Sequence, residues 1–163
     1  MANPKISNNK VQTGTNCEIS ENVIFVGDVK IGNNCKIGNN VIIKHTSIGD
    51  NTIIEDNSII GYGTITGHYY AQKQYREKFN PTEEKKYKIL IGNNVLIRTG
   101  VTIYFDTDIH DNCWINHNTI IRENVHILED TSIGSNTICE NNVSIGKSWI
   151  IHNNTMICSE TII

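Results

Sequence analysis

An aliphatic residue recurs at every sixth position along most of the chain. In the second half the series runs without a slip as Ile91, Ile97, Ile103, Ile109, Ile115, Ile121, Ile127, Ile133, Cys139, Ile145, Ile151, Ile157 and Ile163. The first half has one five-residue step and reads Ile19, Phe25, Ile31, Ile37, Ile43, Ile48, Ile54 and Ile60. The position two residues before each is usually small or β-branched, as at Val95, Val101 and Cys113. Because alternate residues of a strand point to one side, the pattern predicts one short strand per hexad, with both residues facing inward.

Each hexad also carries a regular corner position. The third residue after the aliphatic one is nearly always Asn, Asp or Gly, for example Asn22, Asp28, Gly63, Asn118 and Asn154. These residue types tolerate a positive φ better than others do, so each hexad is expected to contain one sharp turn. Three hexads then close a triangular coil of 18 residues, and stacked coils pair their strands about 4.8 Å apart.

Composition favours β-structure and excludes a helical bundle. The 163 residues include 30 Ile and 9 Val but only 3 Leu, together with 23 Asn and 2 Pro. β-Branched side chains lose rotamer freedom in a helix, and Asn competes there for backbone hydrogen bonds. The length is that of one ordinary domain, so a division into separate cofactor and substrate domains is also excluded.

The hexad resembles the signature of hexapeptide-repeat proteins, which fold as left-handed parallel β-helices. The resemblance covers residues 13–65 and 91–163 and implies an all-β solenoid of about seven triangular coils, within a single domain of residues 1–163. The left hand comes from the resemblance, since right-handed crossovers are the general rule. Residues 66–90 carry no hexad and hold four of the six tyrosines, so we expect an external loop there. A loop of this length usually contributes to a binding site.

Charge and cysteine content narrow the choice of partners. The 14 basic and 17 acidic residues give a net charge of −3, so neither nucleic acid nor a membrane is an expected partner. No apolar stretch is long enough to span a bilayer, and the N-terminus lacks a signal peptide, so a cytoplasmic location is expected. The five cysteines form no CxxC pair, which argues against a disulfide framework and against a zinc ribbon.

The strongest candidate for chemistry is His117. It lies directly before the corner residue Asn118, which places its imidazole at an outer edge. The segment 115–123, Ile-Asn-His-Asn-Thr-Ile-Ile-Arg-Glu, looks like the Gly-His-Asn-x-x-Ile-Arg-Glu stretch of hexapeptide acyltransferases. This resemblance implies that His117 is the general base that takes the proton of the acceptor hydroxyl or amine. A carboxylate is expected to orient its second ring nitrogen, with Glu123 and Asp106 as the candidates.

The same resemblance implies an acyl-CoA-dependent acyltransferase, in particular an acetyltransferase that uses acetyl-CoA and acts on a sugar or a nucleotide-linked sugar. It also implies a homotrimer, in which the loop of one subunit and His117 of the next form the walls of each cleft. The residues expected to contact substrate are Asn116, which replaces the Gly of the family, Asn118, Arg122, Glu123, His68, Tyr69 and Tyr70. Those expected to contact coenzyme A are Gly134, Ser135, Gly146 and Lys147. No role is assigned here to His45, His110, His126 and His152.

Two alternatives keep the fold and change the function. One is a zinc protein similar to the β-helical carbonic anhydrases, whose ligands include two histidines five residues apart. Here His110, His117 and His126 are separated by seven and nine residues. The other is a non-catalytic scaffold or a shortened enzyme, because the chain stops at Ile163 in mid-pattern without a C-terminal cap. The acyltransferase interpretation requires no metal.

Overall fold

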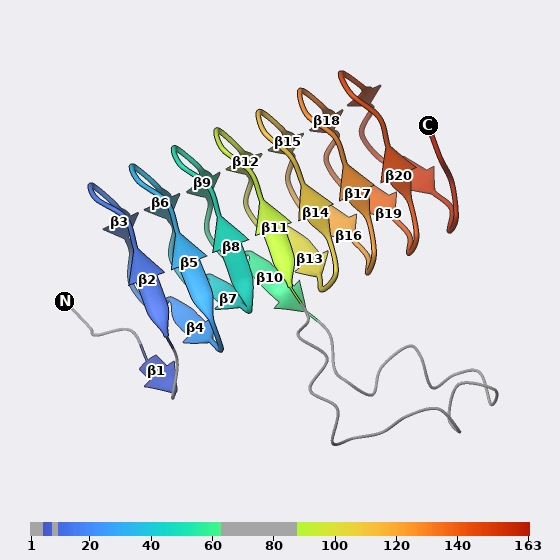
Figure 1. The fold of residues 1–163 in the computed structure, drawn as a ribbon. Helices are drawn as coiled ribbons and strands as arrows, with labels where there is room; N and C mark the ends of the chain where they lie inside the picture. The colour runs from blue at the N-terminus through green and yellow to red at the C-terminus, as the bar shows by residue number, and fades with distance from the viewer. Residues whose placement is uncertain (1–4, 8–9, 63–87) are drawn as a thin grey trace, which may run out of the picture.

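A computed structural model describes residues 5–7, 10–62 and 88–163 of the chain. Within these ranges the chain forms a solenoid of short parallel strands, which stack into three sheets that we call A, B and C (Figure 1). Each coil contributes one strand to sheet A, then one to sheet B and then one to sheet C, and sheet B faces the viewer in Figure 1. The all-β, left-handed parallel β-helix of about seven coils, which the hexads and the family resemblance together predict, is confirmed. No helix in these ranges has the length and apolar character needed to cross a membrane.

Each strand is two to four residues long and pairs only with strands of its own sheet. Sheet A contains β1 (Lys5–Ser7), β4 (Ile24–Val26), β7 (Ile42–Lys44), β10 (Ile59–Tyr62), β13 (Thr102–Tyr104), β16 (Ile120–Ile121), β19 (Ile138–Cys139) and β22 (Met156–Ile157). Sheet B contains β2 (Val11–Thr13), β5 (Val29–Ile31), β8 (Thr46–Ile48), β11 (Ile89–Ile91), β14 (Asp108–Ile109), β17 (His126–Ile127) and β20 (Ser144–Ile145). Sheet C contains β3 (Glu18–Ile19), β6 (Lys36–Ile37), β9 (Ile53–Ile54), β12 (Leu96–Ile97), β15 (Trp114–Ile115), β18 (Ser132–Ile133) and β21 (Ile150–Ile151).

Asparagine side chains at the corner between sheets B and C follow the register of the coils. The Asn94 amide donates to the Asn112 side-chain oxygen at 3.1 Å, 18 residues further on. The Asn34 amide donates to Asn51 at 3.1 Å after only 17 residues, because the five-residue step lies between them. The Asn51 amide donates to Asn94 at 3.2 Å across 43 residues. This span of 43 residues is 25 longer than one coil of 18. The coils before and after the 25 additional residues therefore stack in register.

The additional residues lie between β10 and β11, at the corner between sheets A and B. Ile89 and Leu90 belong to β11, so the structure ends the insertion earlier than the loop expected at 66–90. Ile89 takes the inward position two residues before Ile91 and is 1% exposed. Residues 63–87, which include the predicted substrate contacts His68, Tyr69 and Tyr70, lie outside the described residues.

The two inward columns of residues fill the interior of the solenoid. The aliphatic column is at most 5% exposed from Phe25 to Ile145, and the small or β-branched column is at most 1% exposed. Inward threonines keep their hydroxyls paired; Thr119 Oγ1, for example, donates to the Gly134 carbonyl at 2.9 Å. Ile19, at the edge of sheet C, is 37% exposed, because no strand of that sheet stacks below it. The filled interior restricts any binding site to the faces and corners.

The predicted corner residues adopt a positive φ with one exception among the described residues. Asn118 is typical, with φ of 54°. At Asp28 the prediction is wrong, because Gly27, one residue earlier, takes the turn with φ of 70°. Glycine suits this place because a Cβ there would lie 2.0 Å from the ring of His45. Gly63 lies outside the described residues.

Candidate active site

His117 lies at the corner between sheets C and A, in the turn that links β15 to β16. Hydrogen bonds from both backbone and side chains hold this turn to the next coil. The Asn116 side-chain amide donates to the Ile133 carbonyl at 2.8 Å, and the Asn136 N–H donates to the His117 carbonyl at 2.8 Å. The Asn118 amide donates to the Asn136 side-chain oxygen at 3.4 Å. The backbone that carries the imidazole is therefore fixed by its neighbours.

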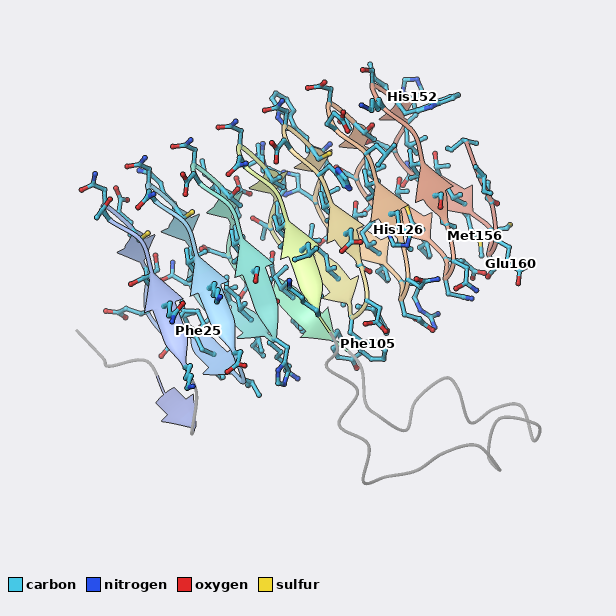
Figure 2. All side chains as sticks on the ribbon, in the orientation of Figure 1. Phe25, Phe105, His126, His152, Met156 and Glu160 are labelled. Carbon is cyan, nitrogen blue, oxygen red and sulfur yellow. The ribbon has the colours of Figure 1, made fainter. Side chains whose placement is uncertain are left out.

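The imidazole itself is half-buried and has no hydrogen bond or ion pair within the described part of the chain. Both ring nitrogens of His117 are therefore available to a ligand or to another molecule. The two candidate orienting carboxylates, Glu123 and Asp106, lie at the corner between sheets A and B instead. Figure 2 labels Phe105, the neighbour of Asp106, at this corner. A carboxylate partner for His117 within the same chain is thus absent from the described residues.

Arg122 and Glu123 form a closely paired group at the corner between sheets A and B. Arg122 Nε and Nη2 donate to the two carboxylate oxygens of Glu123 at 3.0 and 3.2 Å. The guanidinium carbon lies 5.0 Å from the centre of the Tyr104 ring, and Tyr62 contacts Tyr104 edge-on with ring centres 5.0 Å apart. Burial raises the pKa of the Tyr104 phenol. Since β16 separates this group from His117, a substrate that contacts both must lie along the face of sheet A.

Gly134 and Ser135 lie one coil beyond His117, at the same corner. Their backbone groups are already used in the solenoid: the Gly134 N–H donates to Ile151 at 2.8 Å, and the Ser135 N–H donates to the Asn153 side chain at 2.7 Å. A Cβ on Gly134 would lie 2.4 Å from the Asn153 nitrogen, so glycine is required for the coils to approach. A coenzyme at this place would therefore meet side chains such as the Ser135 hydroxyl rather than free N–H groups.

Gly146 and Lys147 lie at the corner between sheets B and C, at the opposite end of the sheet C strands. The ammonium group of Lys147 forms an ion pair with the carboxylate of Glu129. This contact lowers the pKa of Glu129 and raises that of Lys147. The predicted coenzyme contacts thus fall into two groups, one at each of the two corners that border sheet C.

A second histidine, for which the sequence predicts no role, has the carboxylate partner that His117 lacks. His126 lies on the face of sheet B, where β17 pairs with β14 and aligns His126 with Asp108 (Figure 2). His126 Nδ1 lies 3.2 Å from Asp108 Oδ2. The side chains are 42% and 33% exposed, so this pair is open to solvent. The pair could have been found in the sequence, because Asp108 and His126 are polar residues at outward positions and are separated by one full coil of 18 residues.

The histidines of the zinc alternative lie on three different parts of the molecule. His110 is at the corner between sheets B and C, where Nδ1 lies 3.9 Å from Glu129 Oε2. His117 is at the corner between sheets C and A, and His126 is on the face of sheet B. Among the described residues no three His, Cys, Asp or Glu side chains are placed to hold one metal ion.

Two stretches of the chain match a known sequence family. A family model described as bacterial transferase hexapeptide (six repeats) matches residues 10–45 and 106–141. The second match includes the whole segment around His117. Among proteins of curated function, none matches the chain in sequence.

Solved structures of acyltransferases share the fold. A UDP-N-acetylglucosamine acyltransferase superposes with a TM-score of 0.69 at 20% identity, covering 97% of this chain and 67% of the other. The enzyme of that name from Francisella novicida gives 0.51 at 22% identity, covering 90% of this chain and 56% of the other. The one from Bacteroides fragilis gives 0.50 at 19% identity, covering 93% and 67%. At these identities the likeness shows a common fold, and the chain spans little more than half of the Francisella enzyme.

Proposed function

We propose that the chain is an acyltransferase of the bacterial transferase hexapeptide family, whose model matches residues 10–45 and 106–141, with His117 as the general base. The proposed reaction moves an acetyl group from acetyl-CoA to a hydroxyl or amino group of a sugar or nucleotide-linked sugar in the cytoplasm. The observation that carries the proposal is the state of His117: a fixed backbone in a matched repeat, with an imidazole that has no partner within the described chain.

The chemistry needs only a base and an orienting surface. The acceptor oxygen or nitrogen attacks the thioester carbonyl carbon, the imidazole takes the acceptor proton, and the proton then passes to the departing coenzyme A thiolate. Histidine suits this step because its ordinary pKa lies near neutrality. Asn116 and Asn118 flank the imidazole and are proposed to bind acceptor hydroxyls, and Ser135 and Lys147 to contact the coenzyme.

Exposed apolar side chains support the proposed homotrimer. The outward residues of sheet C include Ile53, Leu96, Trp114 and Ile150, and those of sheet A include Ile24, Ile42, Ile59, Ile120, Ile138 and Met156. The outward residues of sheet B are mostly polar, among them Lys30, Ser47, Asp108, His126 and Ser144. Extended apolar surface on a protein generally marks a contact with another molecule. Since sheets A and C, which carry these apolar residues, meet at the corner of His117, a neighbouring subunit is proposed to cover that corner and to supply the orienting carboxylate.

The experiment that tests the proposal is acetyl transfer by a His117→Ala variant. The purified protein is incubated with acetyl-CoA and a panel of sugars and UDP-linked sugars, and the released thiol is measured. General-base catalysis contributes roughly 10²–10⁴-fold, so kcat should fall by at least about 100-fold. The matched control is His152→Ala, which removes an exposed histidine from the same corner.

Size-exclusion chromatography and circular dichroism must show that both variants remain folded and assembled. Wild-type turnover in His117→Ala would remove His117 from the mechanism. Calorimetric titration of the wild-type protein with acetyl-CoA separates the enzyme from a scaffold, because a scaffold gives no binding heat. Absence of both binding and turnover would overturn the proposed function itself.

A further inference from the structure

Three chemically complementary side chains stand in line on the face of sheet B. Asp108, His126 and Ser144 occupy outward positions of the neighbouring strands β14, β17 and β20. The register aligns Asp108 with His126 and His126 with Ser144. Because parallel strands lie about 4.8 Å apart, a carboxylate, an imidazole and a hydroxyl follow one another along the solenoid axis.

The contact with Asp108 determines which nitrogen of His126 acts as a base. Asp108 Oδ2 lies 3.2 Å from His126 Nδ1, and a carboxylate at that distance accepts a hydrogen bond. The proton of the neutral imidazole is therefore held on Nδ1, which leaves Nε2 without a proton and able to accept one. With 42% of its side chain exposed, His126 is also accessible to a substrate from solvent.

Ser144 supplies a hydroxyl on the next strand. Its backbone is fixed, because its N–H donates to Thr161 at 2.9 Å and its carbonyl accepts from the Ile163 N–H at 3.0 Å. Within the described residues its hydroxyl makes no hydrogen bond, so rotation about one side-chain bond can direct it toward the imidazole. Hydrogen bonds between a nucleophile and its base are often loose before substrate binds. Ile162, bridged to Ser144 and 80% exposed, places an apolar surface beside the hydroxyl.

We propose that Asp108, His126 and Ser144 form a nucleophilic site that accepts acyl groups from activated esters and thioesters, separate from His117. Ser144 Oγ forms a bond to the acyl carbon as its proton moves to His126 Nε2. The bond from that carbon to the leaving oxygen or sulfur breaks, and the leaving group takes the proton. Water then attacks the acyl-serine by the same route and releases the carboxylic acid and the free serine.

The test uses p-nitrophenyl acetate as the acyl donor and the whole chain of 163 residues. We expect a burst of nitrophenol and a mass increase of one acetyl group, which peptide mapping assigns to Ser144. Ser144→Ala should abolish this labelling. His126→Gln and Asp108→Asn should each slow it at least about tenfold, because they remove the base or favour the wrong tautomer.

Two controls separate this site from general reactivity and from the proposed acetyltransferase. Ser132→Ala removes an outward serine from sheet C, one face away, and should label at the wild-type rate. His117→Ala should also be labelled at the wild-type rate. The labelling of Ser144 therefore tests this site independently of the proposed function. Acetylation at a residue other than Ser144 overturns the proposal. So does wild-type labelling in folded His126→Gln and Asp108→Asn, which would show that Ser144 reacts without a base.

Discussion

The assignment of inward and outward positions predicts that substitution of two adjacent residues of β15 lowers the free energy of unfolding by very different amounts. Ile115 is completely buried, whereas Trp114 is 56% exposed on the outer side of the same strand. Ile115→Ala deletes three carbon groups, each worth about 0.8 kcal/mol when buried. The isoleucines stacked on either side, Ile97 and Ile133, are also buried and limit collapse into the cavity. With the cavity contribution the expected loss of unfolding free energy is about 3–4 kcal/mol.

Trp114→Ala removes a larger side chain, but more than half of Trp114 is already exposed in the single chain. Its cost to folding should be below about 1 kcal/mol. If Trp114 also contacts a neighbouring subunit, as proposed, the loss of unfolding free energy in Trp114→Ala should be larger at protein concentrations where the trimer forms. The loss in Ile115→Ala should not depend on concentration in this way, because the cavity lies inside one chain.

The assay is urea unfolding followed by far-ultraviolet circular dichroism, for both variants at two protein concentrations. The free energy of unfolding and the slope with urea are compared with those of the wild-type protein. A loss in Trp114→Ala that equals the loss in Ile115→Ala at both concentrations would refute the reasoning. It would mean that the hexad isoleucines are not the inward residues.

Three further predictions concern single side chains. Burial raises the pKa of the Cys139 thiol to about 12, whereas Cys158 is exposed, so a thiol reagent at mildly alkaline pH should label Cys158 quickly and Cys139 only after unfolding. Asn118→Val should cost at least about 1–2 kcal/mol, because φ at this position is 54°, while Asn118→Gly should cost less, as measured by urea unfolding. The backbone N–H and the side-chain amide of Asn93 both donate to Asp111 and lower its pKa, the backbone bond more strongly, so Asn93→Ala, which keeps the N–H, should raise that pKa part of the way to its ordinary value in an NMR titration. Because the carboxylate stabilises the fold above its unfolded pKa, less stability should then be lost on acidification.

The interior could be predicted from the sequence because one period determines both the strands and the stacking. Val95 and Ile97 occupy adjacent inward positions of one hexad, and both are buried as expected. The predictions from the sequence are wrong where a local feature of the backbone outweighs the six-residue repeat. At the first described corner between sheets A and B, Gly27 takes the positive φ expected of Asp28, since glycine has no Cβ to meet the His45 ring.

The candidate site could be predicted only in part, because pairing across coils depends on the register and on the other side chains present. The outer-edge position of His117 followed from its place beside Asn118. The pairing of Glu123 with its neighbour Arg122 depends on side-chain packing, which the hexad does not determine. His126 and Asp108 are different: a coil of 18 residues aligns them directly, so the period itself contains the signal.

The outward residues differ in polarity between the three sheets of the solenoid. Because these residues do not fill the core, each sheet can serve a different function. Apolar outward residues on sheets A and C favour contact with other subunits beside His117, whereas the polar face of sheet B favours solvent beside Ser144. Ile53→Glu, which places a charge on sheet C away from both sites, should therefore separate the two activities. In the dissociated variant, acetyl transfer to a sugar should fall at least about tenfold, because a buried unpaired charge disrupts the contact that completes the His117 site. Acetylation of Ser144 by p-nitrophenyl acetate should continue at the wild-type rate; equal loss of both activities in a folded monomer would contradict this division.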